Sequence, residues 1–170
     1  MRIHVLEREQ PLPGPPEEVF PFFAEAHNLE AITPPLLRFR VITPAPIEMR
    51  VGTTIQYRLR LHGVPVNWLT SIQAWEPPSR FVDVQLRGPY ALWHHTHTFE
   101  PDGDGGGGTR MRDTVHYALP LGGLGELAHR AFVRRDVESI FTFRHDEVAR
   151  RMGRDHGAPP SARRPAARRR

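Results

Sequence analysis

The segment GPYALWHHTHTF (residues 88–99) indicates how this chain folds. Successive side chains of a β-strand point to opposite faces of the sheet. In this segment one face therefore carries Trp93, His95, His97 and Phe99. Two histidines between two large aromatic residues are unusual for an ordinary core strand, and they are typical of an apolar pocket that holds a few polar groups. The segment therefore predicts one wall of a binding pocket.

A second strand supplies polar partners for the same face. A glycine-rich turn over residues 102–108 joins the segment to a predicted strand over 110–119. A one-residue slip of this hairpin would turn two arginines into the pocket, so the pattern constrains the register. The register predicts four facing pairs: Phe99 with Met111, His97 with Asp113, His95 with Val115, and Trp93 with Tyr117.

The predicted His97–Asp113 pair has two interpretations. In one, the carboxylate fixes the imidazole and both groups are structural or bind a ligand by hydrogen bonds. In the other, Asp113 orients His97 to transfer a proton on a bound ligand. A metal held by His95, His97 and Asp113 is a third arrangement, but this spacing is common by chance and we predict no metal.

The neighbouring segment 81–87 leaves its orientation open. Asp83 and Gln85 extend the polar network if Phe81 points inward. If Val82 and Val84 point inward instead, Asp83 is solvated. The strand has no clean alternation of apolar and polar residues, so both orientations stand.

Composition limits the classes of function. A chain of 170 residues supports one domain with a real core, and the absence of cysteine excludes disulfides and thiolate metal sites. All 23 basic residues are arginine, and six of them follow Met152 with only Asp155 against them. The tail is thus +5, and the remaining 17 arginines against 18 acids give −1. We therefore predict no specific nucleic-acid partner. Without a long apolar run or a signal peptide, we expect a cytoplasmic protein with no membrane insertion.

The order of elements predicts an α+β fold. A first strand over 2–10 precedes a helix beginning near 15 and a short helix over 29–32. Strands follow at 36–43, 53–61, 64–75, 81–87, 90–100 and 110–119, and a long helix at 126–152. Residues 153–170 are rich in arginine and proline, and we expect a disordered tail there after a domain of residues 1–152.

Several segments together resemble the START/Bet v 1-like superfamily, also called the SRPBCC or polyketide cyclase/dehydrase-like superfamily, and most closely its bacterial small ligand-binding branch. The matching segments are 28–35, Trp68 with Ile72, 81–85, 88–99, 108–113 and 117–120. The resemblance implies the helix-grip fold, in which a curved antiparallel sheet wraps around a long C-terminal α-helix. It also implies a hydrophobic cavity for a lipid-, aromatic- or polyketide-like molecule. No catalytic motif of the superfamily matches residue by residue.

We therefore expect a protein that binds a small hydrophobic ligand, without a cofactor, rather than an enzyme. The alternative is a cyclase- or dehydratase-like enzyme that uses the His97–Asp113 pair on a polyketide-like substrate. An interaction module that regulates a partner is a third possibility, for which the arginine tail is the one hint. The oligomeric state stays open. The predicted ligand-binding residues are Tyr57, Trp68, Tyr90, Trp93, His95, His97, Phe99, Asp113 and Tyr117.

Overall fold

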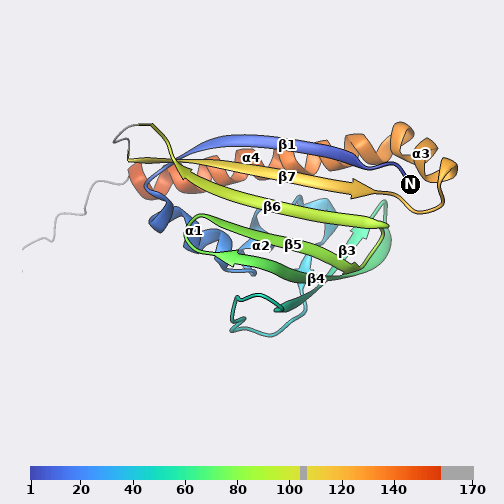
Figure 1. The fold of residues 1–170 in the computed structure, drawn as a ribbon, viewed down its shortest axis with the longest axis horizontal. Helices are drawn as coiled ribbons and strands as arrows, with labels where there is room; N and C mark the ends of the chain where they lie inside the picture. Colours follow the sequence, from blue (N-terminus) through green and yellow to red (C-terminus); the bar gives the residue numbers. More distant parts are fainter. Residues whose placement is uncertain (104–106, 158–170) are drawn as a thin grey trace, which may run out of the picture.

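The computed structural model of the chain describes residues 1–103 and 107–157. Seven strands form one antiparallel sheet in the order β1-β7-β6-β5-β4-β3-β2 (Figure 1). The strands are β1 (His4–Pro13), β2 (Arg40–Val41), β3 (Thr54–Leu61), β4 (Val64–Glu76), β5 (Arg80–Arg87), β6 (Leu92–Pro101) and β7 (Gly108–Ala118). Neighbouring strands in space are mostly neighbours in sequence, and β1 closes the sheet by pairing with β7.

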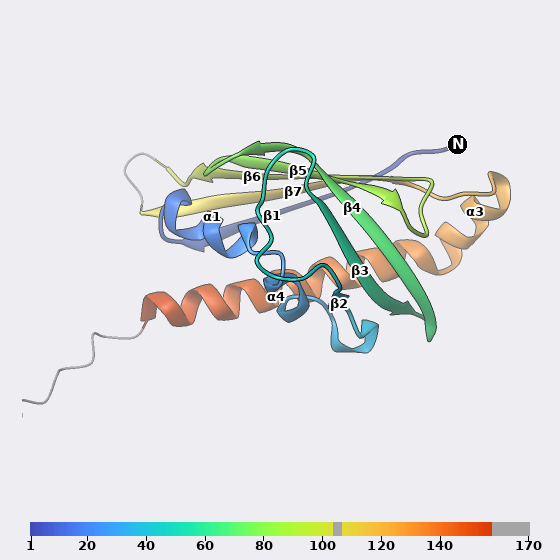
Figure 2. The same ribbon diagram turned by 90° about the horizontal axis from the view of Figure 1, so that it is seen from below.

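One long helical segment crosses the concave side of this sheet, as Figure 2 shows. The segment consists of α3 (Gly123–Ala128), a π-helical turn η2 (His129–Val133) and α4 (Arg134–Gly157). Two short helices, α1 (Pro16–Ala24) and α2 (Asn28–Ala31), and the 3₁₀ turn η1 (Pro35–Leu37) follow β1. The predicted α+β helix-grip fold is confirmed. No helix among the described residues is long and apolar enough to cross a membrane.

Apolar side chains gather in three clusters between the sheet and the helices. The first lies under α1 and includes Phe20, Phe81, Phe99 and Val148. The second joins β1 and β7 to α4 through Leu6, Val115, Tyr117, Val137 and Phe141. The third contains Ala26, Ile55, Tyr57 and Ile72. The helix thus packs against the two ends of the concave face, and the space between the clusters is where a cavity forms.

The hairpin of β6 and β7 has the predicted register. Across it, His97 lies opposite Asp113 and Trp93 opposite Tyr117, and the two other predicted pairs, His95 with Val115 and Phe99 with Met111, are also present. The predicted inward positions are buried, except for the partly buried Trp93, whereas Arg112 on the other face is exposed. Alternation of apolar and polar residues therefore determined this part of the sheet.

Several element boundaries differ from the sequence prediction, and three of these differences have a structural reason or bear on the predicted tail. The predicted strand over 36–43 is the turn η1 followed by a strand of two residues, because the two prolines at 34–35 start a 3₁₀ turn and Arg38 adopts a left-handed conformation with φ 46°. The strand β1 runs to Pro13 instead of ending at residue 10, since an edge strand tolerates proline. The helix α4 ends at Gly157, and the rest of the predicted tail, 158–170, lies outside the described residues.

Candidate functional site

A cavity of about 160 Å³ lies between α4 and the concave face of the sheet. A dry cavity of this size holds a molecule as large as benzene. Most lining residues are apolar, and the aromatic ones are Phe22, Phe23, Phe39, Tyr57, Trp68, Phe81, Tyr90, Trp93 and Phe141. All three apolar clusters contribute to the wall, so the same packing that supports the fold leaves this space open.

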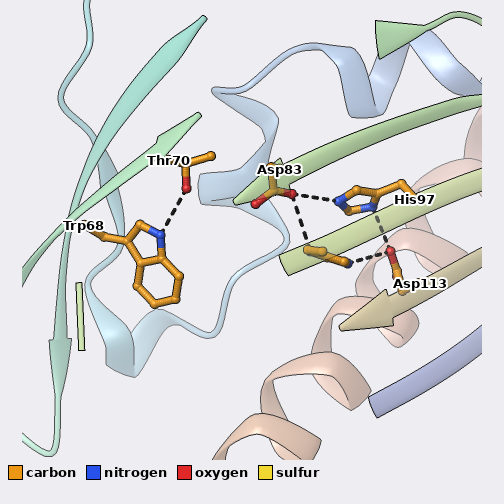
Figure 3. Close-up of polar contacts among 6 residues, drawn as sticks. Trp68, Thr70, Asp83, His97 and Asp113 are labelled. Atoms are coloured by element: carbon orange, nitrogen blue, oxygen red, sulfur yellow. Dashed lines mark hydrogen bonds and ion pairs between the residues drawn. The ribbon is translucent and has the colours of Figure 1, made fainter. Parts of the chain in front are cut away.

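Two tryptophans form an aromatic corner of the cavity. The rings of Trp68 on β4 and Trp93 on β6 meet edge to face, with centroids 5.2 Å apart. The indole Nε1 of Trp68 donates a hydrogen bond of 3.0 Å to the hydroxyl of Thr70 (Figure 3). Because this polar atom is already satisfied, the indole offers only apolar surface to a ligand.

Tyr90 joins the aromatic corner from the turn between β5 and β6. The side chain of Gln85 folds across this turn, donating to the carbonyl of Tyr90 at 2.7 Å and accepting from its amide at 3.3 Å. A Cβ on Gly88 would collide with the Gln85 side chain, so any larger residue here would have to displace that side chain. The side-chain amide of Gln85 therefore stabilises this turn through two hydrogen bonds to the backbone of Tyr90. Gln85 does not belong to the polar network around Asp83.

Four ionisable side chains form what we call the buried His–Asp network: Asp83 on β5, His95 and His97 on β6, and Asp113 on β7 (Figure 3). His97 Nε2 lies 3.2 Å from Asp83 Oδ2, and His95 Nε2 lies 3.0 Å from Asp113 Oδ1. His97 Nδ1 is 2.7 Å from the same Asp113 oxygen, although not directed as a hydrogen bond, and His95 Nδ1 is 3.6 Å from Asp83 Oδ2. Each imidazole nitrogen therefore faces a carboxylate oxygen.

The contacts within the network shift the pKa values of its four members in different directions. Burial alone would raise the pKa of both carboxyls, but the hydrogen bonds and charges of the two imidazoles lower the pKa of Asp83 and of Asp113 below their usual values. Burial would also lower the pKa of His97, but Asp113 and Asp83 outweigh it and raise that pKa. Burial and the neighbouring His97 lower the pKa of His95. The pKa values of the two imidazoles, whose centroids are 3.7 Å apart, are thus shifted in opposite directions, and His97 is the more readily protonated of the two.

The structure brings together most of the predicted ligand-binding residues. Those at the cavity wall are Tyr57, Trp68, Tyr90, Trp93, His95 and His97. Asp113 contacts both histidines without lining the main cavity. Phe99 belongs to the core cluster under α1, and the hydroxyl of Tyr117 bonds to His129 at 2.9 Å, so neither lines the cavity.

Asp83 and Arg144 line the wall but were not among the predicted ligand-binding residues. Asp83 was left open between two orientations, and the structure turns it inward next to His97. Arg144 lies on the cavity side of α4, together with Val137, Ile140 and Phe141. The spacing of these four positions is the signal that could have located Arg144, because they repeat with the period of a helix.

Within residues 1–103 and 107–157, two groups of side chains have donor atoms close enough to hold a metal ion. One is Asp83, His95 and His97, with Asp83 as the third member in place of Asp113, but carboxylates already engage its imidazole nitrogens. The other is His4, Glu126 and His129, which we call the terminal histidine cluster. Three arginines, Arg2, Arg130 and Arg134, line the same hollow, and their charges oppose a cation there.

The model of one protein family, described as polyketide cyclase / dehydrase and lipid transport, matches residues 4–153. The chain belongs to this family. No curated protein matches the sequence. The match spans the whole described sheet and most of α4, so the cavity and the buried His–Asp network both lie within it.

Solved structures of similar fold come from several bacteria. The protein TTHA0849 from Thermus thermophilus is 25% identical, with a TM-score of 0.59 over 85% of this chain and 97% of that protein. The Zhui aromatase/cyclase from Streptomyces sp. R1128 is 14% identical, with a TM-score of 0.73 over 92% and 98% of the two chains. A START superfamily protein from Mycobacterium smegmatis is 10% identical, with a TM-score of 0.64 over 89% and 98%. The last two similarities establish the fold alone.

Proposed function

We propose that this member of the family binds a small apolar or aromatic ligand in the cavity under α4. The observation that carries the proposal is a 160 Å³ space with a largely apolar wall and a few ionisable groups at one side. Such a space gains free energy when an apolar molecule displaces water from it. The aromatic corner of Trp68 and Trp93 gives the ligand flat surfaces to pack against.

Binding is favoured over imidazole catalysis by the state of the histidines. A general base or acid must reach the reacting atom with a free nitrogen. In the buried His–Asp network the Nε2 atoms of His95 and His97 are hydrogen-bonded to Asp113 and Asp83, and their Nδ1 atoms lie 3.6 Å or less from a carboxylate oxygen without a hydrogen bond. A cyclase- or dehydratase-like reaction through the His97–Asp113 pair would require one of these contacts to open.

Binding can be tested with 4-ethylacetophenone, a neutral one-ring ketone, by isothermal titration calorimetry. We expect saturable binding with one site per chain. Replacing Ile140, which lines the cavity, by tryptophan should weaken it at least about tenfold by filling the space. Ala149→Trp is the matched control, since Ala149 is exposed on the same helix. Equal affinity in both variants would place the ligand elsewhere and contradict the proposal.

The same probe tests the enzymatic alternative. In D₂O, a catalytic pair would remove a proton from the acetyl methyl group and protonate the carbonyl oxygen to give the enol. Addition of a deuteron to carbon and loss of the enol hydroxyl proton would then regenerate the ketone with deuterium on its methyl group. Nuclear magnetic resonance reports this exchange directly. We expect no acceleration over free ketone by the protein. Exchange that is accelerated by the wild-type chain and lost in His97→Asn would favour the enzyme.

A further inference from the structure

Several donor groups at the cavity wall have no hydrogen-bond partner among the described residues, and two of them are the guanidinium of Arg144 on α4 and the hydroxyl of Tyr57 on β3. The Nε of Arg144 is sealed from solvent, and no carboxylate of the described chain forms an ion pair with this side chain. Apart from the tyrosine hydroxyls, the other ionisable groups of the cavity side are paired within the buried His–Asp network or, for Glu25, with His27. A sheltered guanidinium without a partner is costly, so this site gains when an acceptor arrives.

The position of Arg144 is fixed by its surroundings. Its guanidinium carbon lies 5.0 Å from the centroid of the Phe141 ring, one helical turn earlier. Burial lowers the pKa of Arg144, whereas the charges of Asp113 and Asp83 act to raise it, and an arginine remains a cation throughout the neutral range. A charged group is therefore held at the wall of an otherwise apolar space.

Tyr57 offers a donor of a different kind. The residue is 8% exposed, and its ring packs against Phe39 with centroids 5.0 Å apart. Burial and the nearby Asp83 raise the pKa of the Tyr57 hydroxyl well above its usual value, so the phenol keeps its proton. Its hydroxyl is then an O–H donor that the folded chain leaves unused.

Neither carboxylate forms an ion pair with Arg144. Asp83 and Asp113 each contact both imidazoles instead, so the histidines occupy them at close range. A ligand group that donates hydrogen bonds would compete with the histidines for Asp83. A ligand group that accepts them finds Arg144 and Tyr57 free.

We propose that the ligand carries a carboxylate on a small apolar body, and that Arg144 and Tyr57 bind this carboxylate. The inference rests on the proposed function, because it names the ligand class of the same cavity. Arginine matches a carboxylate with two parallel hydrogen bonds, which a single-point donor cannot reproduce. The cavity of 160 Å³ fits a body of about one aromatic ring, so an aryl carboxylic acid is the expected class.

A matched pair of probes tests this, using the full chain and isothermal titration calorimetry. The probes are 4-ethylbenzoate and 4-ethylbenzyl alcohol, which share size and shape and differ in charge. We expect the wild type to bind the acid at least about tenfold more tightly, as a charge-assisted hydrogen bond allows. Arg144→Met should abolish this preference and leave alcohol affinity within about twofold. Arg135→Met is the control, since Arg135 is exposed on the same helix and lines no cavity.

Two further variants test the contributions of Arg144 and Tyr57 separately, and an unfolding measurement checks that each variant is folded. Arg144→Lys retains the charge without the fork geometry, and it should keep only part of the preference for the acid. Tyr57→Phe should weaken acid binding several-fold, by the loss of one hydrogen bond, and leave alcohol binding nearly unchanged. Urea unfolding of each variant verifies that it is folded.

The outcomes distinguish the two proposals. Equal affinity of the wild type for acid and alcohol, or a preference that survives in Arg144→Met, would overturn the carboxylate inference and leave apolar binding intact. Binding of neither probe would overturn the proposed function and the inference with it.

Discussion

The buried His–Asp network and the terminal histidine cluster contain the same residue types in different surroundings. In the network, two imidazoles tilted to each other lie between two carboxylates, and the four side chains are 5–18% exposed. In the terminal cluster, two imidazoles stack with centroids 3.5 Å apart beside one carboxylate, Glu126, which is 28% exposed. The first site is mostly buried, and the second lies in an open hollow lined by arginines. Burial, rather than residue type, therefore decides what these charges contribute to stability.

The largest expected difference between the two sites concerns their carboxylates. Asp113→Asn leaves the charge on His97 without its main partner, and we expect a loss of about 3 kcal/mol in the free energy of unfolding, as for other broken buried pairs. Glu126→Gln removes a partly exposed contact, and we expect a loss below about 1 kcal/mol. Urea unfolding of both variants measures the difference. Equal losses would show that the network is no more coupled than a surface ion pair.

The pH dependence of stability sharpens the comparison. The pKa of His97 is raised in the folded chain, so its contribution is complete below the unfolded pKa of about 6.5 and is lost as the pH rises through the folded pKa. We therefore expect the free energy of unfolding of the wild type to fall, as the pH rises from about 6.5 through the folded pKa, more steeply than that of His97→Asn. His116→Gln is the control, since His116 is exposed on the outer face of β7. A parallel fall in wild type and His97→Asn would contradict the raised pKa of His97.

The smallest expected effects concern the tyrosines beside each site. Tyr117 forms a hydrogen bond of 2.9 Å with His129 in the terminal cluster, so Tyr117→Phe should cost about 1 kcal/mol of stability. The hydroxyl of Tyr57 has no partner in the described chain, so Tyr57→Phe should leave stability nearly unchanged while weakening binding of 4-ethylbenzoate. Thermal unfolding measures both. A larger loss for Tyr57→Phe would mean that its hydroxyl is already satisfied without a ligand.

The sequence was sufficient to predict the strands that carry the histidines. Alternation of large and polar residues along β6 and β7 fixes which side chains point inward, and a slip by one residue would bury Arg112. The network could be predicted in part for the same reason. Asp83 could not be oriented, because the neighbouring Phe81 and Val82 are both buried and β5 has no simple alternation of inward and outward side chains.

Arg144 was missed for a different reason. The helix α4 is polar overall, and its arginines occupy several faces, so the sequence does not distinguish an inward arginine from its solvated neighbours. Only the contact with Phe141 and the lining of the cavity identify it. The strand predicted over 36–43 failed because prolines at 34–35 favoured a turn where the apolar pattern alone suggested a strand.

The π-helical turn η2 lies between α3 and α4. The direction in which the side chains of α3 point therefore depends on how many residues this turn contains, more than on which residues they are. A π turn holds one residue more than an α turn of similar rise, and one residue corresponds to about 100° of rotation about the axis. Deleting a residue within 129–133 would leave the helix continuous but turn α3 to another side. Leu124 and Leu127, now exposed, would then face a new direction. Relatives with one residue more or fewer in the segment that corresponds to 129–133 would keep the same cavity under α4. The surface formed by their α3 would be different.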